Sequence, residues 1–471
     1  MTPDAIVVGS GPNGLAAAIV LAKAGLKTVL REAQPTIGGG LRSSELTLPG
    51  FTHDVCSAVH PLALSSPFFR TLPLRKFGLD WIQPPAALAH PLDGGSAVML
   101  ERSIETTAAG LGAGGKGWRK LLGAFVEDWE ELSVDVLAPP VRIPKNPIMM
   151  ARFGLRALQT ATGMARRALT GVEARALFAG NAAHSFLPLD AAGTAAFGML
   201  LSVSGHAVGW PIPRGGSQRL ADALAGYFRL VGGTIETDAP VERLEEVRGA
   251  KVVMLDLTPR QVVRIAGKSL PEGYRRALER YRYGAAAFKV DWALDGPVPW
   301  TAPECARSAT VHLGGTLEEI VASEAAPARG KVHDRPFVLF AQPTLFDSSR
   351  APEGKHTAWA YCHVPNGCPL NLTAHIEGQV ERFAPGFRDR ILARNVFTPA
   401  DLERRNPNLV GGDISGGMMD LRQVFARPVP SLTPYRTPLR GVYLCSSSTP
   451  PGGGVHGMSG YHAATAALAR L

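Results

Sequence analysis

The chain has 471 residues, of which 45% are hydrophobic and 19% are charged, and this composition is that of an ordinary globular protein. So long a chain exceeds one compact domain, and we expect two or three. The net charge of +9 would suit nucleic acid or an anionic membrane. Because the Arg and Lys residues are dispersed and not interleaved with aromatic residues, the composition argues against nucleic-acid binding.

The five cysteines are odd in number and scattered, with no C-x-x-C pair, which excludes a disulfide scaffold and a zinc cage. Cys362 and Cys368 in "CHVPNGC" have the spacing of no common zinc site, so we expect buried cysteines and no bound metal. Residues 1–5 lead directly into "IVVGSG" without the pattern of a secretory signal, and no apolar run is long enough to cross a bilayer. We therefore expect a cytoplasmic protein.

The N-terminal residues follow a strand–helix–strand pattern. The apolar run "AIVVG" predicts a strand, the turn "SGPNG" follows it, and "LAAAIVLAKAG" predicts a helix that Gly25 ends. A second strand, "KTVLRE", comes next. The pattern predicts a β-α-β unit.

The turn carries the pattern G-x-G-x-x-G, formed by Gly9, Gly11 and Gly14. Between a strand and a helix, the first glycine permits the tight turn, the second lets backbone approach a pyrophosphate, and the third lets the helix pack closely. The helix N-terminus adds N–H groups and the positive end of a dipole. Glu32 ends the second strand, where an acid accepts hydrogen bonds from a ribose diol and disfavours a 2′-phosphate. The unit therefore predicts dinucleotide binding.

A second group of glycines, Gly38 to Gly40, follows in "REAQPTIGGGLRSS" and allows another close approach of backbone to a cofactor. A simple nicotinamide dehydrogenase would usually continue here with a further strand–helix unit. The segment therefore favours a flavin dinucleotide.

After Gly50 the chain becomes irregular and rich in proline, and then helical from about Gly117 to Leu137 and again to about Leu201. We interpret this region as the first part of a second domain. Within it, the segment from Lys145 to Gly171 has no acidic residue and five basic ones. A cationic amphipathic helix of this kind can lie on a lipid headgroup layer, and the alternative is a solvated helix face within a cap domain. The basic residues are Lys145, Arg152, Arg156, Arg166 and Arg167.

The α/β pattern returns with a helix from about Ser217 to Val231, the strand "TIETDAPV" and the apolar run "AKVVMLDLT". From about residue 285 to Thr373 we expect mostly alternating strands, which would suit the floor of a substrate cavity. A helix near residues 372–383, the strand "GVYLCSSS", a glycine-rich run and a last helix complete the pattern.

Three stretches extend these motifs: "PGFTHDVCSAVHPLA", "GWPIPRGGSQRLADAL" and "GVYLCSSSTPPGGGVHGMSGYHAA". With the N-terminal motif, they make the chain resemble the FAD-dependent phytoene desaturase and amine oxidase superfamily over nearly its whole length. Within the carotenoid/retinoid oxidoreductase branch it is most similar to bacterial relatives of pyridine nucleotide-disulfide oxidoreductase domain-containing protein 2. Two departures are Gly40, where an Arg often follows the glycine pair, and Ser446 to Ser448, where many relatives have an acid.

The resemblance implies an α/β fold in which a Rossmann-like FAD-binding domain of the glutathione reductase type is interleaved with an α+β substrate domain. The FAD-binding domain would consist of residues 1–72, 206–284 and 419–471. The substrate domain would consist of residues 73–205 and 285–418.

The resemblance also implies FAD as the cofactor. The backbone near Val241 would hold the adenine side, and the C-terminal glycines would lie along the ribityl chain and flavin ring, with the positive end of the last helix toward the flavin. Hydroxyls of Ser446 to Ser448 would supply neutral hydrogen bonds. The residues assigned to the cofactor site are Gly9, Gly11, Pro12, Asn13, Gly14, Glu32, Ala33, Gly38, Gly39, Gly40, Arg42, Val241, Ser447, Gly453, Gly454, Val455, His456, Gly457 and Met458.

His60 and His456 are the candidate catalytic residues, since the resemblance places both near the flavin and an imidazole transfers protons near neutral pH. For each the alternative is a purely structural role. A desaturase needs no strong side-chain base, because the cofactor performs the hard chemistry. The remaining candidates are expected mainly to line the cavity or pack the core: His184, His206, Trp210 and Tyr461.

The predicted function is therefore an FAD-dependent oxidoreductase that removes hydride from an apolar, polyene- or isoprenoid-like substrate, with a separate acceptor reoxidising the flavin. One alternative is a flavin amine or alcohol oxidase. Others are a non-redox, FAD-dependent polyene cis/trans isomerase and a flavin-bearing interaction protein. We expect a small apolar organic substrate, no nucleic acid, and peripheral membrane contact through Lys145 to Gly171 as a further possibility.

Overall fold

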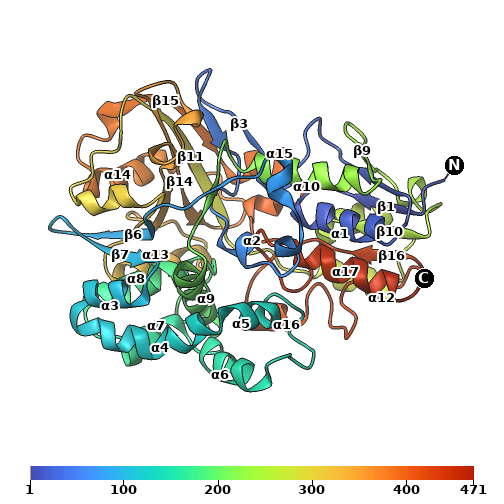
Figure 1. The fold of residues 1–471 in the computed structure, drawn as a ribbon, viewed down its shortest axis with the longest axis horizontal. Coiled ribbons are helices and arrows are strands. Elements are labelled where there is room, and N and C mark those ends of the chain that lie inside the picture. The colour runs from blue at the N-terminus through green and yellow to red at the C-terminus, as the bar shows by residue number, and fades with distance from the viewer. Residues whose placement is uncertain (1) are drawn as a thin grey trace.

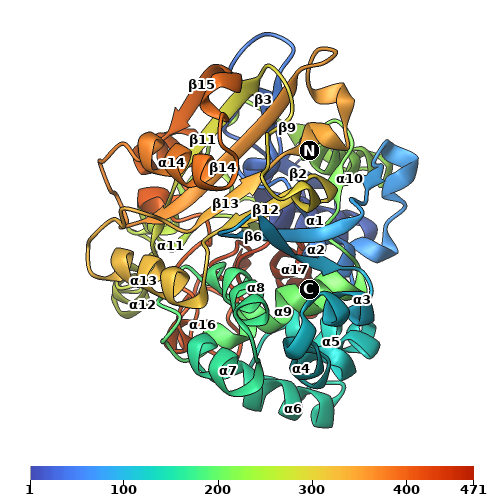
Figure 2. The same ribbon diagram turned by 90° about the vertical axis from the view of Figure 1, so that its left-hand side faces the viewer.

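A computed structural model describes residues 2–471 and contains two large β-sheets and a layer of helices (Figure 1). The first sheet, with β1, β10 and β16, lies on the right in Figure 1 together with both chain ends. The second sheet lies at the upper left, and the helices α3 to α9 lie below it. Figure 2 views the molecule from the left-hand side of Figure 1, so that the second sheet and these helices face the viewer.

Five parallel strands form the first sheet, in the order β16-β10-β1-β2-β9. Three separated stretches of the chain supply them: β1 (Ala5–Val8), β2 (Thr28–Arg31), β9 (Thr234–Glu236), β10 (Val252–Leu255) and β16 (Val442–Leu444). This confirms the predicted α/β class and the Rossmann-like sheet. The limits predicted for the five segments of the two domains stay a prediction. The strand expected over "TIETDAPV" is shorter than expected, since β9 spans only Thr234–Glu236.

Helices cover both faces of this sheet, which explains why its central strands are continuous apolar runs. Ala5 and Val7 of β1 pack with α1 (Pro12–Lys23), α10 (Gln218–Leu230) and α17 (Met458–Leu468). Ile6 and Val8 face the other side, toward α11 (Pro259–Ala266) and α12 (Glu272–Glu279). The helices predicted after Gly11, near Ser217 and at the C-terminus are therefore confirmed.

The second sheet has seven strands in the order β15-β11-β14-β13-β12-β6-β7, mainly antiparallel. Their bounds are β6 (Ala86–Leu92), β7 (Ser96–Glu101), β11 (Ala286–Leu294), β12 (Thr310–Leu313), β13 (Val338–Ala341), β14 (His356–Val364) and β15 (Ile391–Phe397). In β11 the predicted alternation is present: Phe288, Val290 and Trp292 share a core with α14 (Thr373–Phe383). Lys289 and Asp291 lie on the opposite face and are buried as well.

One helix in this region, α13 (Leu317–Ala328), is absent from the sequence prediction. Its start carries a recognisable signal, since the hydroxyl of Thr316 accepts a hydrogen bond from the Glu319 N–H while the Glu319 carboxylate accepts one from the Thr316 N–H. This T-x-x-E pattern is a capping box.

The helical layer consists of α3 (Ile104–Gly110), α4 (Gly115–Glu127), α5 (Trp129–Val136), α6 (Pro147–Ala157), α7 (Ala161–Ala168), α8 (Val172–Ala183) and α9 (Thr194–Ala207). The expected single cationic helix over Lys145 to Gly171 is wrong, because the segment forms the two helices α6 and α7. Thr160 adopts an extended backbone between them, and its hydroxyl accepts the Gly163 N–H as the N-cap of α7.

Short elements connect these layers. They are the pairs β3 (Ser43–Glu45) with β4 (Thr52–Asp54) and β5 (Trp81–Ile82) with β8 (Ile212–Pro213), and the helices α2 (Pro61–Ser65), α15 (Pro399–Arg405) and α16 (Leu421–Phe425). Across residues 2–471, every helix is too short or too polar to cross a bilayer.

Candidate active site

Two helix N-termini lie side by side at the carboxyl edge of the first sheet. Helix α1 follows β1 with Gly11 as its N-cap, and α17 follows β16 with Gly457 as its N-cap. A Cβ at Gly460 would lie 1.8 Å from the Asn13 carbonyl oxygen, so the two helices are in backbone contact. Neither helix has an acid in its first turn or a capping side chain on its N-cap residue. The edge therefore presents two positive dipole ends to one region.

The predicted roles of the first and third glycines agree with the geometry of the turn. Gly9 has a φ of +100°, in the region that favours glycine. A Cβ at Gly14 would lie 2.0 Å from the Gly9 carbonyl oxygen, so only glycine lets α1 pack this closely on the turn. At Gly11, a Cβ would lie 2.7 Å from a carboxylate oxygen of Asp256. The second glycine, Gly11, thus lies directly beside the carboxylate of Asp256, a residue that follows strand β10.

Asp256 directly follows β10 and is buried. One of its carboxylate oxygens accepts the Gly14 N–H at 2.9 Å, so the carboxyl caps the first turn of α1. Burial, with a smaller effect of the Glu32 charge, raises its pKa to about 7, and across residues 2–471 no Lys or Arg forms an ion pair with it. Sequence reasoning missed this residue. The available signal was an acid directly after a buried parallel strand, where such a sheet binds its ligands.

Glu32 joins the two glycine-containing turns. Its carboxylate accepts hydrogen bonds from the Ser10 N–H at 3.0 Å, the Gln34 N–H at 3.0 Å and the Arg42 guanidinium at 3.1 Å, and also from the Ser10 hydroxyl. The Ser10 hydroxyl in turn accepts the Gly38 N–H at 3.0 Å. Since a carboxylate offers about four lone-pair sites, a ribose hydroxyl would have to replace one of these donors. The predicted ribose contact stays a prediction, and Ser10 is a further residue that sequence reasoning missed.

A cavity of about 550 Å³ lies between the turn after β2 and the segment 395–409. Its wall includes Gly39, Gly40 and Cys56 together with the basic side chains of Arg42, Arg404 and Arg405. The guanidinium of Arg42 is held by Glu32 and by the Thr36 carbonyl oxygen, at 3.1 Å from each. Arg42 is therefore placed at the cavity wall, and cations and bare glycine backbone form a surface that suits phosphate groups.

The C-terminal glycine run wraps around the start of α17. Gly454 has a φ of +122°, and a Cβ there would lie 2.8 Å from Leu62. His456 is buried; its Nδ1 accepts the Met458 N–H at 3.0 Å, and its carbonyl oxygen accepts the Ser66 hydroxyl at 2.6 Å. Burial lowers the pKa of His456 to about 4, so the ring is neutral near pH 7. The imidazole caps the first turn of α17, and its catalytic role stays a prediction.

The three serines before this run differ from expectation. The Ser446 hydroxyl donates to the Leu257 carbonyl oxygen at 2.8 Å, and the Ser448 hydroxyl donates to that of Gly416 at 2.7 Å. Both hydroxyls are thus used within the chain, because the loop must satisfy buried carbonyl groups. Within residues 2–471 only the Ser447 hydroxyl of the three makes no hydrogen bond, so Ser447 alone keeps the predicted role.

His60 is the N-cap residue of α2 and is buried. Its Nε2 lies 2.8 Å from the Ser217 hydroxyl, which itself donates to the Ser57 carbonyl oxygen at 2.7 Å. The serine therefore accepts from Nε2–H, which leaves Nδ1 as an acceptor with no partner among residues 2–471. Burial lowers the pKa of His60 to about 4. A neutral ring with one free lone pair is consistent with either a structural or a proton-accepting role.

The other predicted aromatic residues lie in packed surroundings. His206 accepts the Trp118 indole N–H at 2.9 Å within the helical layer, and Tyr461 packs against Phe68 at a ring distance of 5.1 Å. His184 lies between Trp210 and His312, with its Nε2 3.1 Å from that of His312. Ala33 is exposed and Val241 packs in the core below the first sheet.

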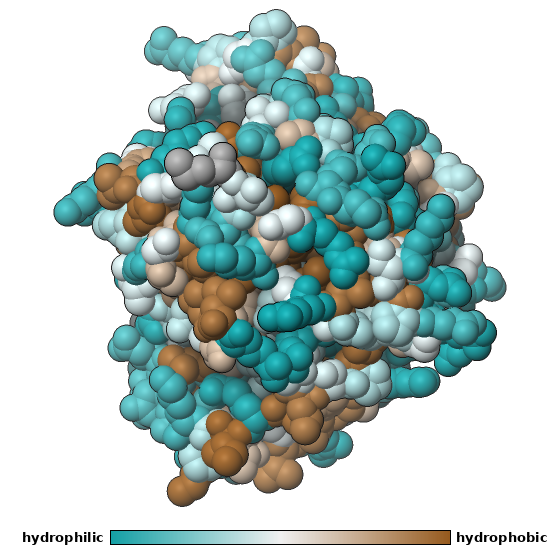
Figure 3. All heavy atoms as spheres, turned by 90° about the vertical axis from the view of Figure 1, so that its right-hand side faces the viewer, coloured by the Kyte–Doolittle hydropathy of each residue, from teal (hydrophilic) through white to brown (hydrophobic). Residues whose placement is uncertain are grey.

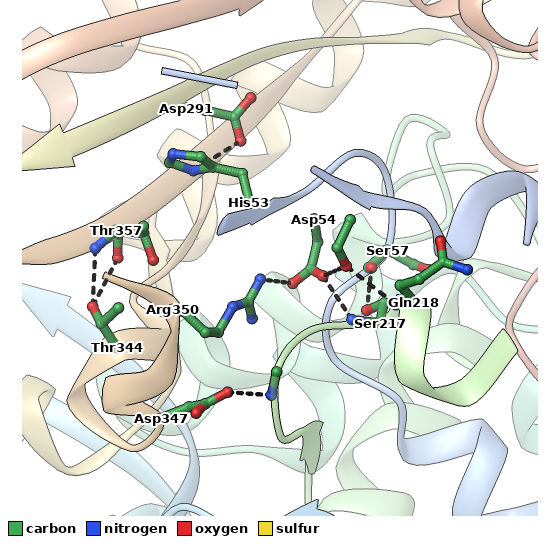
Figure 4. Close-up of polar contacts among 12 residues, drawn as sticks. His53, Asp54, Ser57, Ser217, Gln218, Asp291, Thr344, Asp347, Arg350 and Thr357 are labelled. Carbon is green, nitrogen blue, oxygen red and sulfur yellow. Dashed lines mark hydrogen bonds and ion pairs between the residues drawn. The ribbon is translucent and has the colours of Figure 1, made fainter. Parts of the chain in front are cut away.

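A buried ionic network joins the first sheet's segments to the second sheet (Figure 4). Asp54 accepts hydrogen bonds from the Arg350 guanidinium at 2.6 Å, the Ser217 N–H at 2.8 Å and the Ser43 hydroxyl at 2.7 Å. In Figure 4 the neighbouring His53 points the other way, toward Asp291. Charges so deeply buried need close partners, which ties the two parts of the molecule together.

A further buried ion pair lies behind the cavity. The Lys289 ammonium pairs with Asp291 and lies 5.2 Å from the centre of the Trp359 ring. The sequence showed Lys289 only as the polar member of an alternating strand. Among residues 2–471, no cluster of His, Cys, Asp and Glu side chains could hold a metal ion, and all five cysteines are free thiols.

Comparisons with known proteins agree with this arrangement. The NAD(P)-binding Rossmann-like domain family matches residues 7–71. The mouse pyridine nucleotide-disulfide oxidoreductase domain-containing protein 2 is 28% identical over 98% of this chain and 92% of its own length. A lycopene-forming phytoene desaturase of Pseudescherichia vulneris is 26% identical over 98% of both chains. The fold is also that of a putrescine oxidase solved with putrescine, which has a TM-score of 0.64, 17% identity and full coverage of both chains.

Proposed function

We propose that this chain, as a member of the superfamily of FAD-dependent oxidoreductases that includes the phytoene desaturases and the amine oxidases, removes a hydride from an apolar, polyene- or isoprenoid-like substrate. In this proposal a separate acceptor takes the electrons. The observation that carries it is the meeting of the α1 and α17 N-termini in a cradle of bare glycine backbone.

The residues present fit FAD. A Cβ at Gly39 would lie 3.1 Å from the Gly11 Cα, so the two glycine turns already approach as closely as glycine permits. The α1 N-terminus and Arg42 would hold the diphosphate, and the run that ends at Gly457 would lie along the flavin. When bound, FAD supplies the hydride acceptor of the reaction.

An apolar substrate is supported by a row of rings on one face of β14. Trp359 and Tyr361 are stacked with their centres 6.0 Å apart, and Phe186 stacks on Tyr361 at 6.2 Å. The row begins against Ala58, two residues from Cys56 in the cavity wall. Aligned aromatic faces bury a flat, unsaturated chain by dispersion and exclude water from it.

In this proposal the side chains of the protein contribute little acid–base catalysis. His60, His184 and His456 are each held neutral by burial, with pKa values lowered to between about 3 and 4. Of these, His60 has an unpartnered Nδ1 that could accept a proton while its Nε2–H stays bound to Ser217. Neutral, buried side chains add no charge to the apolar surroundings that a hydrocarbon requires.

The proposal is tested with the purified full-length protein under anaerobic conditions. We expect flavin absorbance, and bleaching of that absorbance by detergent-dispersed polyenes or isoprenoids such as phytoene but not by small amines such as putrescine. Product analysis would then detect a new double bond. Bleaching by amines alone would overturn the substrate class in favour of an amine oxidase. Isomerised product without bleaching would indicate the non-redox isomerase, and a protein that neither contains nor takes up flavin would overturn the proposal altogether.

A further inference from the structure

Helix α6 and the segment before it expose an unusual density of large apolar side chains. Of the 13 such side chains that are exposed among residues 2–471, five fall between residues 141 and 158. Ile143, Ile148 and Leu155 are 90%, 79% and 73% exposed, and Val141 and Leu158 are about half exposed. In Figure 3 apolar side chains gather along the lower edge of the molecule, the end at which Figure 1 places α6.

The inner face of α6 already has its packing partners. Phe153 and Ala157 are buried in the core of the helical layer, and Phe153 meets Phe125 edge-on at a ring distance of 5.6 Å. Ile148 and Leu155, two turns apart on the other side of the helix, face outward. Helix α6 thus has two apolar faces, and residues 2–471 cover only one of them.

The surroundings of the exposed face are cationic. From residue 136 to residue 171 the chain has no Asp or Glu, and Arg142, Lys145, Arg152 and Arg156 accompany the exposed apolar side chains. Arg142 is neutralised by the buried Asp135, whereas Lys145 and Arg152 form no ion pair within residues 2–471. Helix α7 differs, since its Arg166 pairs with Glu318 and its apolar face is buried.

We propose that the surface formed by residues 141–158 docks this protein onto an anionic lipid bilayer. Apolar side chains of an interfacial helix enter the boundary between headgroups and acyl chains while Lys and Arg contact anionic headgroups. No helix of the described chain could span the bilayer, so the contact is peripheral. Docking of a second copy through the same face would bring like charges together, and the patch exposes none of the aromatic side chains on which nucleic-acid bases stack. This inference does not rest on the proposed redox function.

Vesicle flotation of the full-length protein tests the proposal. We expect the wild-type protein to float with vesicles of phosphatidylcholine and phosphatidylglycerol, and to partition at least tenfold less onto phosphatidylcholine alone or at 1 M salt. The variant Ile148→Glu/Leu155→Glu should lose at least tenfold in partitioning. Because each basic residue near an anionic surface strengthens binding about fivefold, Lys145→Glu/Arg152→Glu should also lose at least tenfold.

The matched control is Leu370→Glu/Leu392→Glu, which places the same charges at two half-exposed leucines outside the docking surface. It should float as the wild-type protein does. Circular dichroism and gel filtration verify that each variant is folded. The proposal is overturned if the wild-type protein does not bind vesicles, if Ile148→Glu/Leu155→Glu binds normally, or if that variant instead converts a dimer to a monomer.

Discussion

The N-termini of α1 and α17 differ in the buried group that caps each one. A carboxyl of Asp256 accepts the N–H of Gly14 in α1, and an imidazole nitrogen of His456 accepts the N–H of Met458 in α17. Burial disfavours the charged form of both groups. It therefore raises the pKa of the Asp256 carboxyl to about 7 and lowers the pKa of the His456 imidazole to about 4. The first cap can therefore change its charge near neutral pH, whereas the second stays neutral.

This difference corresponds to what each helix would face. A diphosphate at α1 would bring negative charge toward Asp256, and a protonated carboxyl could remain beside it where a carboxylate would repel it. At α17 a neutral cap leaves the positive dipole end available for the flavin edge. The two helix ends thus have the same backbone geometry and different electrostatic behaviour.

The largest effect is expected from Gly454→Val in the run that leads to α17. Because Gly454 has a φ of +122° and a Cβ would lie 2.8 Å from Leu62, the variant cannot keep this loop conformation. We expect FAD retention to be lost after gel filtration, with binding weakened at least 100-fold in a fluorescence titration. A variant that holds FAD normally would show that the run does not form the cofactor site.

The contact between the two helices is tested by Gly460→Ala. A methyl group 1.8 Å from the Asn13 carbonyl oxygen must push α17 away from α1, at a cost of about 1–3 kcal/mol in the free energy of unfolding. The matched control is Gly273→Ala in α12, where a Cβ has no neighbour within 4 Å, and this change should stabilise by about 0.5–1 kcal/mol. Urea unfolding measures both, and equal effects would contradict the close crossing of the helices.

The cap of α1 predicts a loss of stability with rising pH, whereas the cap of α17 predicts a loss with falling pH. Since the folded-state pKa of Asp256 is raised above its unfolded value, its contribution to stability is greatest below about pH 4 and is lost as the pH rises to about 7, by at most about 1.4 kcal/mol per unit. FAD binding should likewise weaken up to about tenfold per pH unit above 7. Asp256→Asn keeps an acceptor for the Gly14 N–H and should remove both dependences, as urea unfolding and FAD titration at pH 5 to 9 would reveal.

The smallest effect is expected at His456. In His456→Asn the amide oxygen can still accept the Met458 N–H, so we expect a change within about 0.5 kcal/mol, whereas His456→Leu loses the cap and should cost about 1 kcal/mol. Relative to wild type, both variants should lose about 0.8 kcal/mol less stability at pH 6 than at pH 8, because the folded imidazole stays neutral while His456 in the unfolded chain takes up a proton near its ordinary pKa. Thermal unfolding at the two pH values measures them. Loss of turnover in His456→Asn at unchanged stability would instead assign the ring a catalytic role.

Some helices and strands could be predicted from the local sequence pattern alone. The strand, turn and helix around Gly9 to Gly14 follow from apolar periodicity and glycine spacing, and the T-x-x-E start of α13 was a readable signal that sequence reasoning passed over. The break between α6 and α7 was harder to predict, because the local sequence is helix-forming and the extended backbone of Thr160 is stabilised by α7 as it begins.

By itself the sequence determined that a dinucleotide-binding turn begins at Gly9 and that a second glycine run completes the fold near the C-terminus, because the conformations that glycine permits are properties of single residues. Only the tertiary structure decided that Asp256 caps helix α1 at Gly14, which lies 242 positions earlier in the chain. It also decided that Lys289 and Arg350 form buried ion pairs with Asp291 and Asp54. Desolvation and charge pairing depend on distances between segments far apart in the chain. No local pattern encodes those distances, and they decide which of the predicted groups can change its charge.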